Sequence, residues 1–302
     1  MVPNIPAAEW TVDEPLVRAL LREQAPALAG SEVRAFGHGW DNEMFAVGDT
    51  LLARLPRRAQ SVPSIRHEAA WLPVLAARLT VPIPNPVLVG KPGTLFPHPW
   101  LLVPLLHGTT AATHPVSARG VLAPALARFL IGLHRPAPAD APRNPFRGQS
   151  LDGSALRSRI SARLDALGAA SDDLRPRWEA WSNAPPWPHP PVWLHGDLHP
   201  LNILMDAVGH LSGVLDWGDV TSGDPACDLA AAWLLFDRAG RADFWAVIAA
   251  EGDYDAAITQ RAAAWALHFG LIFASMADNQ PLLTAVGDHT LAALRTAAAD
   301  RG

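Results

Sequence analysis

Residues 195–204 read HGDLHPLNIL and residues 214–219 read VLDWGD, and these two stretches decide how the 302-residue chain is interpreted. They place Asp197, Asn202 and Asp216 five and then fourteen residues apart. Carboxylate and amide oxygens are hard ligands, which suit magnesium and do not suit a soft metal. The pattern therefore indicates a magnesium site at Asn202 and Asp216 and leaves the Asp197 carboxylate free of the metal.

Strand-forming residues flank both stretches. Residues 192–194 (VWL) and 211–215 (LSGVL) are predicted strands, and residues 206–209 (DAVG) are a predicted turn between hairpin strands. Apolar flanks of this kind make the intervening loops rigid. Phosphoryl transfer needs this arrangement, because magnesium neutralises the phosphate charge while a free carboxylate, here Asp197, accepts the proton of the attacking hydroxyl.

The double motif resembles the aminoglycoside phosphotransferase and choline kinase-like family of small-molecule kinases. In that family H-G-D-x-x-x-x-N replaces the H-R-D-x-x-x-x-N of protein kinases, and D-W-G or D-F-G carries the metal-binding aspartate. The resemblance implies that Asp197 is the catalytic base and that Asn202 and Asp216 hold Mg²⁺, with ATP or GTP as co-substrate. It also implies an α+β, two-lobed protein-kinase-like fold, with an antiparallel five-stranded N-terminal sheet lobe and a larger, mainly helical C-terminal lobe.

A glycine-bearing hairpin lies upstream. Residues 33–55 read VRAFGHGWDNEMFAVGDTLLARL and predict three short strands separated by two turns. Glycines let the backbone approach phosphates closely and point amide groups at them. We therefore assign Gly37, Gly39 and Asn42 to nucleotide binding, although Gly-His-Gly is also an ordinary turn.

Arg54 lies in the third of these strands, where the kinase pattern places a cation for the α- and β-phosphates. Glu68 lies in the predicted helix 64–78, and an ion pair between the two would hold that cation. Protein kinases have lysine at this position, but arginine also grips phosphate. Arg57 and Arg58 follow within the next turn, so either could serve in place of Arg54.

The predicted lobes meet at a hinge of about residues 102–108. The first lobe spans residues 1–104 and the second residues 105–302, with the catalytic and metal loops at 192–219. The resemblance implies that backbone groups of the hinge, including Val103 and Leu105, hydrogen-bond the purine. The other predicted elements are helix 10–28, strands 87–90 and 100–104, and helices 118–134, 154–167, 174–181, 228–238, 241–250 and 254–276.

Two histidines flank the proposed base and raise the alternative of a zinc site. Zinc chemistry would not call for Asn202 or Asp216 at these distances. We expect His195 to hydrogen-bond the backbone and hold the loop. His199 remains a possible neighbour of the substrate or metal.

Other polar residues receive weaker assignments. Asp219 could reach the metal or a substrate amine, and Asp224 before Pro225 marks the start of a helix. His134 at a helix end is expected to be structural. The proline-rich loop 136–145 is expected to be a rigid connector.

Composition narrows the class of protein. A net charge of −5 and a pI near 6.2 argue against a nucleic-acid partner. No apolar run approaches the ~20 residues of a membrane span, so we expect a cytoplasmic protein without a membrane partner. The single cysteine, Cys227, cannot form an internal disulfide and is expected to pack in the interior. Of the twelve tryptophans, most should fill the core and one or two could line a substrate cleft.

The expected partners are a nucleotide and a small molecule that accepts phosphate on a hydroxyl, with the protein acting as a monomer or homodimer. The resemblance favours an aminoglycoside or related antibiotic, and hence antibiotic resistance. Alternatives are a macrolide, choline or homoserine-like metabolite, or a nucleotide-binding regulatory module without catalysis. Metal-assisted hydrolysis of a phosphoester would use similar carboxylates but has no use for the glycine hairpin and hinge.

Overall fold

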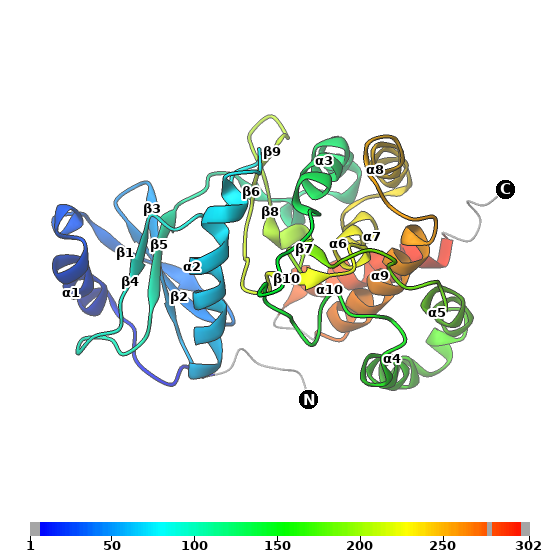
Figure 1. Cartoon of the computed structure of the whole chain (residues 1–302), viewed down its shortest axis with the longest axis horizontal. Helices are drawn as coiled ribbons and strands as arrows, with labels where there is room; N and C mark the ends of the chain where they lie inside the picture. The colour runs from blue at the N-terminus through cyan, green and yellow to red at the C-terminus, as the bar shows by residue number, and fades with distance from the viewer. Residues whose placement is uncertain (1–6, 277–279, 297–302) are drawn as a thin grey trace. The chain divides into compact units, whose positions relative to one another are not determined.

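The computed structural model describes residues 7–276 and 280–296, which form two compact units (Figure 1). The first unit runs to His107 and also includes Val214–Gly218. The second unit comprises Gly108–Gly213 and the chain from Asp219 onward. The residues around Asp216 thus group with the N-terminal unit, although they are distant from it in sequence.

The first unit is built on one antiparallel sheet with strand order β1-β2-β3-β5-β4. Its five strands confirm the prediction for this part of the chain. Apolar residues alternate along the strands, so that Leu55 and Trp100 face one layer while Leu52 and Leu101 face the other. The strands are β1 (Val33–His38), β2 (Asn42–Val47), β3 (Leu51–Pro56), β4 (Leu88–Gly90) and β5 (Trp100–Pro104).

Two helices pack on this sheet. Helix α1 (Glu14–Gln24) buries Leu20 and Leu21 in the cluster that contains Leu55, whereas α2 (Val62–Ala76) buries Ile65 in the cluster that contains Leu101. Each helix therefore covers its own apolar face.

Helix α1 is shorter than the predicted helix 10–28. The Asp13 carboxylate accepts a hydrogen bond from the Leu16 amide at 2.9 Å and begins the helix there. At the other end Pro26 starts a separate 3₁₀ turn. These local polar and proline signals override the apolar periodicity on which the longer prediction depended.

Short strands in the second unit correct the predicted hairpin. β7 (Val192–Leu194) pairs with β10 (Thr221–Gly223), not with the strand that follows the 206–209 turn. That turn joins β8 (Ile203–Met205) to β9 (Leu211–Val214), and β6 (Thr109–Thr110) pairs with β8. The sequence analysis missed β6, β8 and β10 because two- or three-residue strands carry almost no periodic signal.

The helices account for most of the second unit, as predicted. The prediction of one helix over residues 228–238 is wrong, because two short helices, α6 and α7, occupy this part of the chain. Helix α8 begins after them, where the Asp237 carboxylate accepts a hydrogen bond from the Gly240 amide at 2.9 Å. The helices are α3 (Ala123–Leu133), α4 (Ser154–Leu167), α5 (Arg175–Ser182), α6 (Ala226–Leu229), α7 (Ala231–Leu235), α8 (Arg238–Glu251), α9 (Ile258–Ala274) and α10 (Pro281–Thr296).

Helix α10 was not predicted. It packs closely along α9, as Figure 1 shows, and a Cβ atom at Gly287 would lie 2.1 Å from the Ala274 amide nitrogen. Small residues permit this close approach, and they weaken the apolar periodicity that would have revealed the helix.

One helical stretch of the described residues, Val116–Leu133, is long and apolar enough by length and composition to cross a membrane. In the structure 44% of it is buried, and its α3 part packs against α8. A buried core helix passes the same test, so this stretch is weak evidence for a span.

Candidate active site

The loop after β7 is held by a buried carboxylate. Asp228 accepts hydrogen bonds from the His195 amide at 2.7 Å and from the Gly196 amide at 2.9 Å. Gly196 has φ +87°, and a Cβ atom there would lie 2.5 Å from the carbonyl oxygen of Asp219. The His195 ring accepts from the Asp197 amide at 3.2 Å, which confirms that this histidine holds the loop. These contacts pack the loop tightly.

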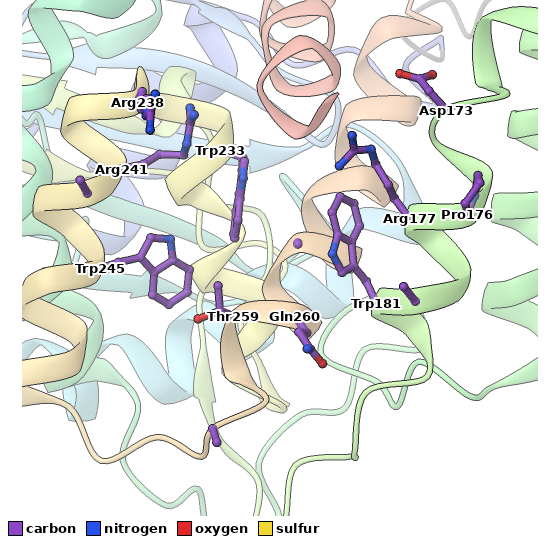
Figure 2. A pocket seen from close by; sticks show the side chains of 14 residues that line it. Asp173, Pro176, Arg177, Trp181, Trp233, Arg238, Arg241, Trp245, Thr259 and Gln260 are labelled. Carbon is purple, nitrogen blue, oxygen red and sulfur yellow. The ribbon is translucent and has the colours of Figure 1, made fainter. Parts of the chain in front are cut away.

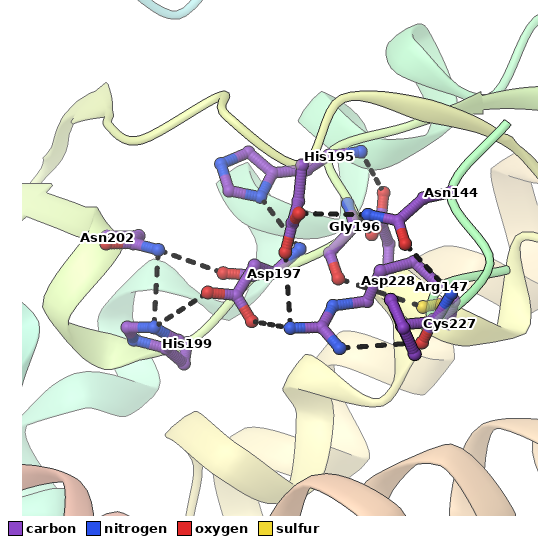
Figure 3. A network of polar contacts seen from close by, with 11 residues as sticks. Asn144, Arg147, His195, Gly196, Asp197, His199, Asn202, Cys227 and Asp228 are labelled. Carbon is purple, nitrogen blue, oxygen red and sulfur yellow. Dashed lines mark hydrogen bonds and ion pairs between the residues drawn. The ribbon is translucent and has the colours of Figure 1, made fainter. Parts of the chain in front are cut away.

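The side chain of Asp197 receives a positive partner on one oxygen and an imidazole on the other (Figure 3). Arg147 Nη2 lies 3.1 Å from Oδ1, and His199 Nε2 lies 3.4 Å from Oδ2. The Leu201 amide donates to His199 Nδ1 at 3.3 Å, and Nε2 is the ring nitrogen that faces Asp197. Burial alone would raise the pKa of Asp197, but Arg147 and His199 outweigh it and lower the pKa well below its usual value.

Asn202 lies beside the same loop. Its Nδ2 donates to the backbone carbonyl of Asp197 at 2.9 Å. Because the amide nitrogen is used in this way, the amide oxygen is the atom that can serve a cation.

Asp219 joins this network through Arg147. Its Oδ2 lies 3.2 Å from Arg147 Nη2, and its Oδ1 accepts from Asn144 Nδ2 at 2.9 Å. The guanidinium also lies over the ring of Phe269, 5.2 Å from the ring centre. The sequence analysis missed Asn144 and Arg147, which stand at the end of a proline-rich connector where no spacing or periodicity marks them.

Three residues for which the sequence predicted a structural role, Cys227, Asp224 and His134, lie in the second unit. Cys227 is buried, and Asp224 accepts from the Ala226 amide at 2.9 Å, as expected at a helix start. His134 ends α3 and lies between the Tyr254 hydroxyl and Asp228, at 2.8 and 3.3 Å, which confirms its structural role.

The first unit contains the expected ion pair. Arg54 and Glu68 are both buried and joined by two hydrogen bonds, one of them 3.1 Å from Nη2 to Oε1. Burial alone would lower the pKa of Arg54, but the charges of Glu68 and Asp216 raise it above its usual value. Arg57 instead contacts Glu43 at 2.7 Å. The Arg54 alternative is therefore the one that makes the pair.

The glycine hairpin keeps open space at its tip. A Cβ atom at Gly37, where φ is +143°, or at Gly39 would meet no atom within 4 Å. Arg57 Nη1 donates to the Gly39 carbonyl at 3.0 Å, so the arginine supports the turn. Asn42 is buried at the start of β2.

Asp216 and the predicted hinge also belong to the first unit. Asp216 has φ +55°, a left-handed conformation that no other non-glycine residue adopts in the described part of the chain. Trp217 Nε1 donates to the Val214 carbonyl at 3.0 Å and fixes this turn. Val103 is buried in β5, and the Leu105 amide donates to the Thr50 carbonyl at 2.8 Å, so this N–H group is already used within the sheet unit.

A hollow of about 970 Å³ lies within the second unit (Figure 2). Helices α5, α7, α8 and α9 contribute its walls, and Trp181, Trp233 and Trp245 line it. None of the residues around Asp197 described above lines this hollow. It is therefore distinct from the polar network of Figure 3.

The antiparallel sheet unit, the helical unit and the loop around Asp197 define a kinase-like phosphotransferase. The model of the phosphotransferase enzyme family (APH) matches residues 32–265, and the chain belongs to this family.

Solved structures of similar fold include the GDP complex of aminoglycoside 2'-phosphotransferase-IIIa, with a TM-score of 0.69, 20% identity and coverage of 95% of this chain and 100% of that one. Macrolide 2'-phosphotransferase MphH from Brachybacterium faecium has a TM-score of 0.62 and 25% identity, covering 94% and 98%. The uncharacterized protein YcbJ of Bacillus subtilis is 27% identical over 72% of this chain and 74% of its own. These likenesses confirm the predicted fold class and family.

Proposed function

We propose that this phosphotransferase moves the γ-phosphate of ATP or GTP to a hydroxyl of an aminoglycoside or related antibiotic in the cytoplasm, as a monomer or homodimer. The observation that carries the proposal is the Asp197 carboxylate, kept ionised by Arg147 and held on a rigid loop. A carboxylate in this state can orient an acceptor hydroxyl and take its proton as the phosphorus is attacked.

The residues present fit magnesium. The Asn202 amide oxygen and the Asp216 carboxylate are oxygen donors of the kind that Mg²⁺ takes in proteins. Bound there, the ion would neutralise charge on the phosphates. Asp197 is left to orient the hydroxyl and hold its proton.

The nucleotide is assigned to the first unit. Arg54, fixed by Glu68, presents a permanent positive charge for phosphate oxygens. The open hairpin at Gly37 and Gly39 allows close approach of the backbone to the phosphates. Hinge backbone at Val103 and the carbonyl of Leu105 would serve the purine, since the Leu105 amide is engaged within the sheet unit.

Relatives in structure support the acceptor class. Proteins of similar structure form complexes with kanamycin, gentamicin and streptomycin, and others are macrolide phosphotransferases. A kinase of a small metabolite such as choline remains the alternative acceptor class, and a regulatory module without catalysis is the alternative activity.

The test follows labelled phosphate from [γ-³²P]ATP or [γ-³²P]GTP, with magnesium, into kanamycin, erythromycin, choline and homoserine. We expect label in one of the antibiotics, and Asp197→Asn should lower kcat by about 10²-fold or more because the general base is lost. Asp206→Asn is the matched control: Asp206 lies in the β8–β9 turn, caps the turn amides and should leave kcat unchanged.

Each alternative gives its own result. Label in a metabolite alone replaces the antibiotic with a metabolite acceptor. Label only in inorganic phosphate indicates hydrolysis. Nucleotide binding without turnover in the wild type, and equal behaviour of Asp197→Asn, would establish the regulatory module and end the enzymatic proposal.

A further inference from the structure

The residues Asp197 and Asp219 of the second unit lie close together. The backbone of Asp219 packs so closely on Gly196 that a Cβ atom on the glycine would lie 2.5 Å from the Asp219 carbonyl oxygen. Asp197 is the next residue along that loop. This close packing places the backbones of the two acidic residues beside one another.

A single nitrogen bridges these two carboxylates. Arg147 Nη2 contacts Asp197 Oδ1 at 3.1 Å (Figure 3). The same nitrogen lies 3.2 Å from Asp219 Oδ2. The side chains of Arg147, Asp197 and Asp219 are 18%, 24% and 36% exposed. Because water screens such partly buried charges only weakly, two adjacent carboxylates would repel strongly without the cation between them.

The position of the guanidinium is itself fixed. Its plane lies over the buried ring of Phe269, 5.2 Å from the ring centre. The loop that carries it is anchored to β10, because the Asn144 amide donates to the Thr221 hydroxyl at 2.8 Å. Asn144 also holds the second oxygen of Asp219 at 2.9 Å. The arrangement is a built bridge and not a solvated surface pair.

We propose that Arg147 is a positioning residue of the phosphotransferase: it neutralises Asp219 and thereby holds the Asp197 carboxylate in the orientation that receives the acceptor hydroxyl. The inference rests on the proposed function and extends it, since it assigns a part in the active site to a residue just after the proline-rich loop 136–145. Arg147 acts through Asp197 and requires no contact with the substrate.

The first experiment compares Arg147→Met with Arg147→Lys, using the labelled transfer assay and kanamycin as acceptor. Arg147→Met should lower kcat by about 10²-fold with little change in the KM for nucleotide, because a misplaced base impairs the chemical step more than binding. Arg147→Lys keeps the charge and should recover about tenfold of that loss. Equal loss in both variants, or a change in nucleotide KM alone, would overturn the proposal.

Arg157→Met is the matched control. Arg157 also lies over a ring, 6.0 Å from the centre of Trp178, and donates to the Ser182 carbonyl at 3.0 Å. Within the described residues Arg157 bonds Ser182 and Asn183 and no carboxylate of the loop around Asp197. This variant removes the same side chain from similar packing, so it should keep the wild-type kcat.

The second experiment tests charge compensation directly. In the double variant Arg147→Met, Asp219→Asn the repulsion is removed together with the cation, so kcat should rise about tenfold above that of Arg147→Met alone. A purely structural role for Arg147 predicts additive losses in the double variant. Additive losses would contradict the inference.

A crystal structure of Arg147→Met gives a readout that needs no substrate. We expect the fold to be retained and the Asp197 carboxylate to turn away from Asp219. If Asp197 stays in place, the inference fails whatever the enzyme transfers. If Asp197 turns but the wild type phosphorylates no acceptor, the proposed function fails while the structural role of Arg147 stands.

Discussion

His268 should make the stability of the protein depend on pH near neutrality. The imidazole is 3% exposed, lies against Trp265 and Phe269, and has no hydrogen-bond partner on Nδ1. Burial, aided by the positive charges of Arg147, Arg163 and Arg159, lowers the pKa of His268 to about 3. The ring is therefore neutral in the folded protein at pH values where an exposed histidine takes up a proton.

The direction follows from proton linkage. Below about pH 6.5 the unfolded chain binds a proton at His268 that the folded chain does not bind, so stability is lost as the pH falls towards 3. For these two pKa values, the loss between pH 7.5 and 5.5 is roughly 1.4 kcal/mol. It would approach its full value only near the folded-state pKa.

Urea unfolding at pH 7.5 and 5.5, followed by tryptophan fluorescence, measures this term. His268→Gln should reduce the pH-dependent loss of unfolding free energy by roughly 1.4 kcal/mol relative to wild type. The difference between the two pH values is the readout, so a constant destabilisation by the substitution does not affect it. His189→Gln is the control, because His189 is exposed in the same unit and stays solvated on folding. An unchanged pH dependence in His268→Gln would refute the reasoning.

Two further pairs of substitutions test the stability of each unit separately, and thermal unfolding measures both. Glu68→Gln leaves the Arg54 charge buried without its partner and should lower the free energy of unfolding by about 3 kcal/mol. Its control, Asp49→Asn, removes an exposed carboxylate and should change that free energy by less than about 0.5 kcal/mol. Equal effects of the two substitutions would show that the buried pair contributes nothing. Gly196→Ala and Gly209→Ala both strain a left-handed backbone, with φ +87° and +91°. Only Gly196→Ala also places a Cβ 2.5 Å from a backbone oxygen. It should therefore lower the free energy of unfolding by about 1–2 kcal/mol more than Gly209→Ala does. Similar losses would mean that the close packing of the catalytic loop relaxes easily.

The parts of the fold that the sequence predicts well are those with a long periodic signal. The sheet unit has five strands of alternating or continuous apolar residues, and helix α4 begins and ends where its pattern does. Helix α10 and the short strands β6, β8 and β10 escaped prediction, because tight packing through glycine and very short pairing leave no period to detect. Helix 10–28 was overextended because its caps, Asp13 and Pro26, are weaker signals than its leucines.

The candidate site, like the fold, could be predicted only in part. Its acids can be predicted because two short motifs at a fixed spacing contain them, but their counter-charges come from segments remote in sequence. Arg147 is 50 residues from Asp197, and Arg261, which contacts Asp224 at 2.6 Å, is 37 residues away from it. An ion pair requires only that two side chains meet in the folded chain, so no local pattern encodes it. Since a nearby cation stabilises the charge on a buried carboxylate, segments remote from the motifs contribute to the electrostatics of these acids.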